Sequence, residues 1–347
     1  MQLYKFSILC AGLIFNLASL QQIIGINPSY IILLLKNSIK IREIILLSVV
    51  CFFLVYQTFI ENYIIINYLQ ILLDIALGFL IFNIITLTKN QTTLQIISRY
   101  TNFLICLAIL SAFDYYFLGN YLNNFLSWIT LWGNSGDFIP RLSLTFGNPN
   151  WASFTCFLFL VIAYLLKSSF LLKMKILSLI IFFQSKSAIL IAIFFVIINS
   201  KNPIRKSLIF FSVIAFSLFS FPIISIQDTA SYFYRLIMYE EILNITQLYP
   251  LGLIGESELR YLISSTSEDT LPTILTLLYG LGWIFFILFL VYYLIKIFQS
   301  RIQLSIGISL GLFSLVYSFL SISIVAGIGV TLFLLAINKD AIRLDSK

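Results

Sequence analysis

Residues 271–295 read LPTILTLLYGLGWIFFILFLVYYLI, and this stretch contains no charged side chain. A helix needs about 20 mainly apolar residues to cross the hydrocarbon core of a bilayer, and a buried strand is much shorter. The stretch therefore predicts a transmembrane helix. Apolar runs of the same kind recur along the rest of the chain, which predicts a polytopic membrane protein.

The composition of the whole chain agrees with this interpretation. Of its 347 residues, 60% are hydrophobic and 10% are charged, and the mean hydropathy is +1.02. Because soluble domains are about one quarter charged, the composition excludes a soluble enzyme, a disordered protein and a disulfide-stapled secreted domain. We expect one all-α integral membrane domain, residues 1–347, with about 12 transmembrane helices. The expected spans are 6–21, 23–35, 44–60, 63–87, 101–118, 151–167, 174–184, 187–200, 207–224, 271–295, 303–319 and 322–338.

The positions of the basic residues predict the orientation. If both termini are cytoplasmic, all but four of the 21 Lys and Arg residues fall in inner loops, where membrane proteins concentrate positive charge. The net charge of +7 then needs no nucleic-acid partner. Two long outer loops with interfacial helices, 119–150 and 225–270, complete the predicted architecture. The four basic residues left on the outer side are Arg141, Lys186, Arg235 and Arg260.

Histidine is absent from the chain, which excludes a histidine base, a haem-ligating histidine and any metal site built on histidine. We expect neither a metal nor a cofactor. The cysteines are scattered through apolar runs and form no CxxC pair, so each is expected to be a buried apolar side chain. They are Cys10, Cys51, Cys106 and Cys156.

Residues 141–150, R-L-S-L-T-F-G-N-P-N, precede the sixth span. The turn signal at Asn148-Pro149 delivers the chain into an apolar helix with Asn150 in its first turn. A helix N-terminus offers N–H donors and a positive dipole end to an anion, and Arg141 would join such a site. The alternative is an ordinary helix start beside an interfacial arginine.

Ser185-Lys186-Ser187 interrupts an apolar stretch at the outer ends of two short spans. A cation flanked by hydroxyl groups suits a phosphate or a lipid head group. The alternative is a hairpin tip whose lysine extends to the membrane surface.

The two remaining outer arginines, Arg235 and Arg260, differ in whether a nearby acidic residue can account for their charge. Arg235 lies in an amphipathic stretch, 231–243, that reads as an interfacial helix. No acidic residue lies three or four positions after it, so an intrahelical ion pair does not explain it and we favour a functional role. Arg260 follows Glu256 by four residues, and a surface ion pair is its leading explanation.

Three carboxylate positions stand out. Glu268-Asp269 adjoins the start of the tenth span, where it would cap the helix or act as a general base. Asp74, near the middle of the fourth span, is either functional or part of a polar network. Asp114, near the outer end of the fifth span, fits either interpretation.

Taken in order, five segments resemble the motifs of the O-antigen ligase and O-antigen polymerase superfamily of bacterial membrane proteins. In the second, lysine stands where the family usually has arginine. The segments are 141–150; Ser185-Lys186-Ser187-Ala188; Arg235-Leu-Ile-Met-Tyr; Pro250-Leu-Gly-Leu-Ile-Gly255; and Glu268-Asp269-Thr270 followed by Tyr279-Gly-Leu-Gly-Trp283.

This resemblance implies a metal-independent glycosyltransferase of lipopolysaccharide or exopolysaccharide biosynthesis in the bacterial inner membrane, working on its outer (periplasmic or extracellular) face. Its donor would be a glycan on a polyprenyl diphosphate such as undecaprenyl diphosphate. Membrane lipid, a chain-length regulator and a flippase would be its partners. Glu268 or Asp269 would act as the base. The diphosphate and substrate would be bound by Arg141, Lys186, Arg235, Arg260, Asn148 and Asn150.

The missing histidine separates the branches of that superfamily. The ligase branch usually carries histidine in the last motif, whereas this chain has Glu268-Asp269 there. We therefore expect polymerisation of lipid-linked repeat units, with ligation to a lipid or protein acceptor as the alternative. A solute or lipid-linked-sugar transporter with Asp74 as its coupling site is a second alternative, although no internal repeat is evident.

Overall fold

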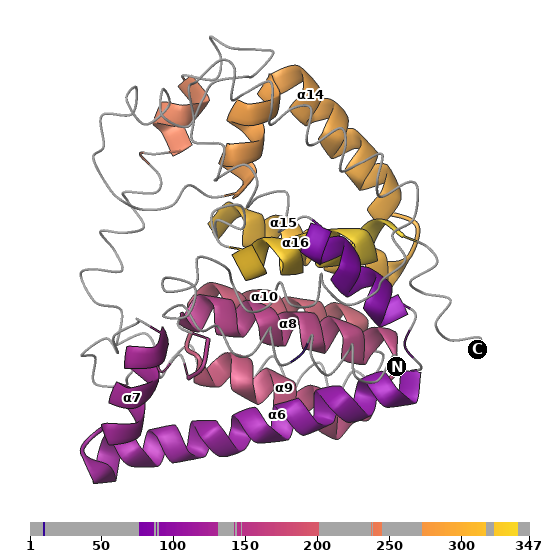
Figure 1. The fold of residues 1–347 in the computed structure, drawn as a ribbon. Coiled ribbons are helices and arrows are strands. Elements are labelled where there is room, and N and C mark those ends of the chain that lie inside the picture. Colours follow the sequence, from indigo (N-terminus) through magenta and orange to yellow (C-terminus); the bar gives the residue numbers. More distant parts are fainter. Residues whose placement is uncertain are drawn as a thin grey trace.

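The computed structural model is all-helical in the residues that it describes (Figure 1). Helix accounts for 88% of this part of the chain and no strand occurs in it, which confirms the all-α prediction there. The predicted spans 23–35, 44–60 and 207–224 lie outside it, as does 6–21 apart from Cys10. The described residues are Cys10, 76–86, 88, 90–130, 142, 144–146, 148–200, 237, 239–244, 273–316 and 323–338.

Helices occupy the other predicted spans, with different boundaries. Among the described residues, Asn90–Leu118 is the one helix of 29 residues whose length and composition suit a membrane crossing, and six others are apolar but 10–17 residues long. The main elements are Ala76–Thr86, α6 (Asn90–Phe113) continued by the π-helix η2 (Asp114–Leu118), α7 (Tyr121–Thr130), α8 (Pro149–Leu165), α9 (Phe170–Phe182), α10 (Lys186–Asn199), α14 (Thr273–Ile297), α15 (Arg301–Val316) and α16 (Ser323–Ile337).

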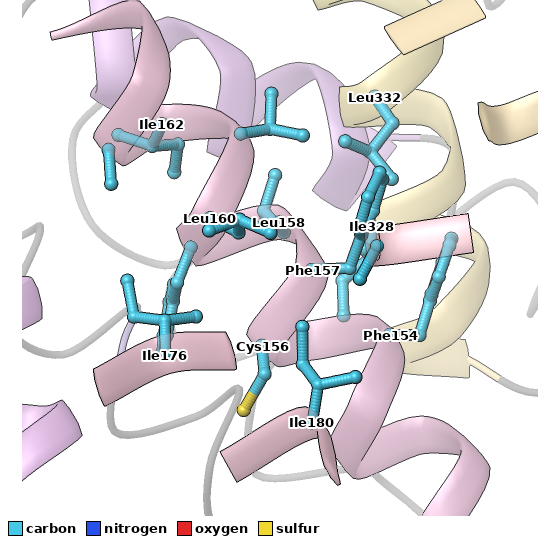
Figure 2. Packing of buried hydrophobic residues seen from close by; sticks show 14 of the residues in the cluster. Phe154, Cys156, Phe157, Leu158, Leu160, Ile162, Ile176, Ile180, Ile328 and Leu332 are labelled. Carbon is cyan, nitrogen blue, oxygen red and sulfur yellow. The ribbon is translucent and has the colours of Figure 1, made fainter. Parts of the chain in front are cut away.

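Helix α8 is the centre of the core. Its sequence is apolar on all sides, and such a helix is stable only when neighbours cover it all round. Fourteen of its 17 residues are buried. Figure 2 shows Ile176 and Ile180 of α9, with Ile328 and Leu332 of α16, packed around it.

Aromatic contacts fix the directions of the helices around α8. The Phe157 ring of α8 lies 5.4 Å from Phe195 of α10 and 5.0 Å from Phe313 of α15, measured between centroids. The Asn199 amide at the end of α10 donates to the Ser305 hydroxyl near the start of α15 (2.7 Å). Phe146, just before α8, also contacts Phe183, just before α10. Helices α8 and α10 therefore run parallel, and α15 runs against them. We call the end of the bundle where α8 and α10 begin the Lys186 end.

The helix Ala76–Thr86 crosses α16 at a glycine. The Thr331 hydroxyl donates to the Gly78 carbonyl oxygen (3.1 Å). A Cβ at Gly78 would lie 2.5 Å from the Val330 Cβ and 2.9 Å from the Gly327 carbonyl oxygen. The two backbones therefore approach too closely for any side chain at position 78.

Helix α14 is broken at Gly282, where φ is 70° and ψ is 167°. That conformation is essentially restricted to glycine, so the predicted span 271–295 is two helical segments rather than one straight helix. The second segment is held by the Tyr293 ring, which stacks 5.5 Å from Phe333 of α16. The Tyr293 hydroxyl also donates to the Gly307 carbonyl oxygen of α15 (3.0 Å).

The segment 119–150, predicted as an outer loop with an interfacial helix, contains the amphipathic helix α7. One prediction needs correction. Cys10 and Cys156 are buried as expected, but Cys106 is exposed on α6, so the prediction of a buried side chain is wrong there. That face of α6 points away from the core. Cys51 lies outside the described residues.

We expect Gly78→Ala to lower the apparent melting temperature of the purified full-length protein. The added methyl group overlaps Val330, and overpacking of this kind costs about 1–3 kcal/mol. Differential scanning fluorimetry measures the shift. The control is Gly311→Ala, because nothing lies within 4 Å of a Cβ at that position. A Gly78→Ala protein as stable as the Gly311→Ala protein would contradict the close crossing.

Candidate functional site

The structure describes three of the eight predicted site residues. Lys186, Asn148 and Asn150 are placed, and they lie at the same end of the bundle. Asp74, the alternative coupling residue, is outside the described part of the chain. The other predicted site residues outside it are Arg141, Arg235, Arg260, Glu268 and Asp269.

Asn148 and Asn150 form the start of α8. Asn148 is the N-cap in an extended conformation, and its side-chain oxygen accepts from the Asn150 N–H at 2.8 Å. Pro149, the first helical residue, has no N–H. The α8 start thus uses its own groups to satisfy its first donors, as in an ordinary capped helix. The start of α8 therefore has fewer backbone N–H groups available to bind an anion than the sequence predicted.

The start of α10 is built differently. Ser185 is the N-cap, and its buried side chain makes no capping hydrogen bond to the helix. Lys186 is the first helical residue, and it is exposed. The ammonium group and the positive end of the helix dipole therefore coincide at this point. Of the two helix starts, α10 is the more electropositive.

An aromatic contact holds the two starts together. Phe146, just before the α8 cap, lies 5.6 Å from Phe183, just before α10, with the rings edge to face. Both side chains are buried. Two parallel helices thus present positive dipole ends on one side of the bundle, and an anion there would relieve their mutual repulsion.

A segment of the second predicted outer loop reaches the same end. The Tyr239 hydroxyl donates to the carbonyl oxygen of Leu315, near the end of α15. That end of α15 lies beside the start of α8, because Phe313 contacts Phe154 at 4.9 Å. Residues 239–244 are helical and Ile242 is buried, in agreement with the helix predicted at 231–243. No sequence signal predicts a contact between residues so far apart.

Asp114 is a structural residue at the corner between η2 and α7. It is 3% exposed, and its carboxylate accepts from the backbone N–H of Asn123 (3.0 Å) and from the Asn123 amide (3.1 Å). The Asn123 amide also donates to the Ser111 carbonyl oxygen (2.8 Å). Gly119 and Asn120 turn the chain with φ of 80° and 68°. The sequence left this role open because the partner lies in the next helix.

Comparison with known protein families, curated proteins and solved structures finds no match to this chain. The functional inference therefore depends on the residues at the Lys186 end and on the order of the motifs along the chain.

We expect Tyr239→Phe to speed amide hydrogen exchange in residues 239–244 about fivefold, because one hydrogen bond contributes about 1 kcal/mol. Mass spectrometry of the exchanged peptides measures it. Tyr116→Phe is the control, since Tyr116 is an exposed side chain on η2. Unchanged exchange in the Tyr239→Phe protein would show that this contact does not hold the segment.

Proposed function

We propose that this chain is a multi-pass membrane glycosyltransferase that polymerises lipid-linked oligosaccharide repeat units on the outer face of a bacterial inner membrane. The observation that carries the proposal is the convergence at the Lys186 end. The start of α8, the start of α10 and the helix at 239–244 meet there. They belong to three of the five segments that resemble the O-antigen polymerase and ligase superfamily.

Two features support a membrane location with about 12 spans. The second half of α14 exposes bulky apolar side chains that an aqueous surface would not favour, including Phe285, Leu288 and Ile295. The charge distribution requires α8 and α10 to run inward and α9 and α15 to run outward. The directions derived from side-chain contacts are consistent with that alternation, and in the proposed orientation the Lys186 end is the outer one.

The proposed reaction is transfer of a glycan from polyprenyl diphosphate to a sugar hydroxyl group. The hydroxyl oxygen attacks the anomeric carbon, and the bond from that carbon to the diphosphate oxygen breaks. Polyprenyl diphosphate leaves with the electron pair, and the hydroxyl proton passes to Glu268 or Asp269. A carboxyl group has an ordinary pKa near 4, which makes its carboxylate a weak base. Burial would raise that pKa and strengthen Glu268 or Asp269 as the base.

The chemistry requires positive charge at the leaving group. Lys186, together with the α10 dipole, supplies it in this proposal, and Arg141, Arg235 and Arg260 add to it. Guanidinium groups bind phosphate oxygens in pairs, which holds the diphosphate in one orientation. Asn148 contributes through its amide group, since its side-chain oxygen caps α8.

We expect Lys186→Gln to reduce long-chain glycan about 10- to 100-fold, because a hydrogen bond to a charged group contributes about 1.5–3 kcal/mol. The measurement is the size distribution of surface glycan in cells lacking the chromosomal gene and expressing the variant. Lys186→Arg should retain activity, since the charge remains. Lys296→Gln removes a lysine charge on α14, where its ammonium lies over Tyr292, and it serves as the matched control.

The products in cells that lack the protein separate the alternatives. Single repeats on the final acceptor indicate a polymerase. Long lipid-linked chains that never reach the acceptor indicate a ligase and contradict the proposal. The break at Gly282 in α14 is a feature that transporters share, so an unchanged glycan pattern would favour transport.

A further inference from the structure

Four cations gather where α8 ends and α9 begins, at the end of the bundle opposite Lys186. Lys167 follows α8, Lys173 and Lys175 lie in the first turns of α9, and Arg99 lies on α6. We call these four residues the basic corner. The sequences of α6, α8 and α9 and of the turn between α8 and α9 contain no acidic residue.

Neighbouring helices fix the two lysines of α9. The Lys175 ammonium donates to the side-chain oxygen of Asn102 on α6 (2.8 Å). Asn102 follows Arg99 by three residues. The Lys173 ammonium lies 4.3 Å from the centre of the Tyr164 ring on α8. Tyr164 precedes Lys167 by three residues. Residues two positions apart lie on opposite sides of a helix, so Lys173 lies on the α8 side with Lys167, and Lys175 lies on the α6 side with Arg99.

An exposed apolar stripe begins beside the basic corner. On α6, Phe103 follows Arg99 by one turn, and Ile109, Leu110 and Phe113 continue the same exposed face. From Phe103 to Phe113 the helix rises about 15 Å, at about 1.5 Å per residue. One leaflet of a bilayer has a hydrocarbon depth of about 15 Å, half of the total. Exposed apolar side chains continue at Phe117 and Leu118 of η2, so the stripe is at least as long as one leaflet is deep.

We propose that the basic corner and this stripe bind an anionic phospholipid, with its phosphate at Arg99 and Lys175 and its acyl chain along α6. The inference rests on the membrane location in the proposed function and goes beyond its chemistry. A free phosphate would gain nothing from the apolar stripe, whereas a lipid uses both parts of the surface. Basic surfaces at the cytoplasmic side of membrane helices favour anionic lipids in this way.

The test is native mass spectrometry of the detergent-purified full-length protein titrated with phosphatidylglycerol. Phosphatidylcholine with the same acyl chains and inorganic phosphate are the comparison ligands. We expect phosphatidylglycerol to bind more tightly than either. Each lysine or arginine near a membrane surface contributes about a fivefold preference, so the double variant Arg99→Gln/Lys175→Gln should bind it about 25-fold more weakly. Leu110→Ser should weaken lipid binding while all four cations remain.

Lys296→Gln is the matched control, and it should bind phosphatidylglycerol as the unmodified protein does. Unchanged affinity in the double variant, or equal affinity for phosphatidylcholine, would overturn the inference. Inorganic phosphate that competes fully with the lipid would also overturn it and identify a free-anion site. The glycan assay of Lys186→Gln is a separate readout, so a failed polymerase proposal and a failed lipid site are distinguishable.

Discussion

The burial of α8 is the constraint on which the other described helices depend. A helix that is apolar on every side has no face to leave uncovered, and here α9, α10, α15 and α16 surround it. Phe157 is the clearest case, because its ring contacts Phe195 of α10 and Phe313 of α15. Truncation of a buried phenylalanine of this kind costs about 3–5 kcal/mol. The apolar sequence of α8 thus determines both the core and the arrangement around it.

The candidate site is a consequence of that arrangement. Because short turns connect α8, α9 and α10, consecutive helices run antiparallel, and α8 and α10 run in the same direction. Two helix starts must then lie at the same end, and the edge-to-face contact of Phe146 with Phe183 aligns them. The same alternation places the basic corner at the other end. The separation of the two helix starts from the basic corner therefore has a purely topological cause.

Much of this organisation could be predicted from residue patterns, and the exceptions have physical causes. Hydropathy located the apolar part of α6 at 101–118, but the helix begins at Asn90 because its polar first turns still form helical hydrogen bonds. The Asn148 cap follows from a local turn signal. The role of Asp114 and the Tyr239 contact could not be predicted, since both depend on partners in other elements. The break at Gly282 was hidden because glycine itself does not specify a conformation.

The hydrogen bond from Thr331 to Gly78 joins residues 253 positions apart. Ribosomes add about 5–20 residues per second, so the partner of Gly78 is made roughly 13–50 s after it. The helix Ala76–Thr86 must therefore survive without this neighbour while the rest of the chain is synthesised. Its packing against α16 can be completed only after Thr331 has been made. A chain truncated before α16 therefore leaves the Gly78 side of this helix without the surface that it packs against.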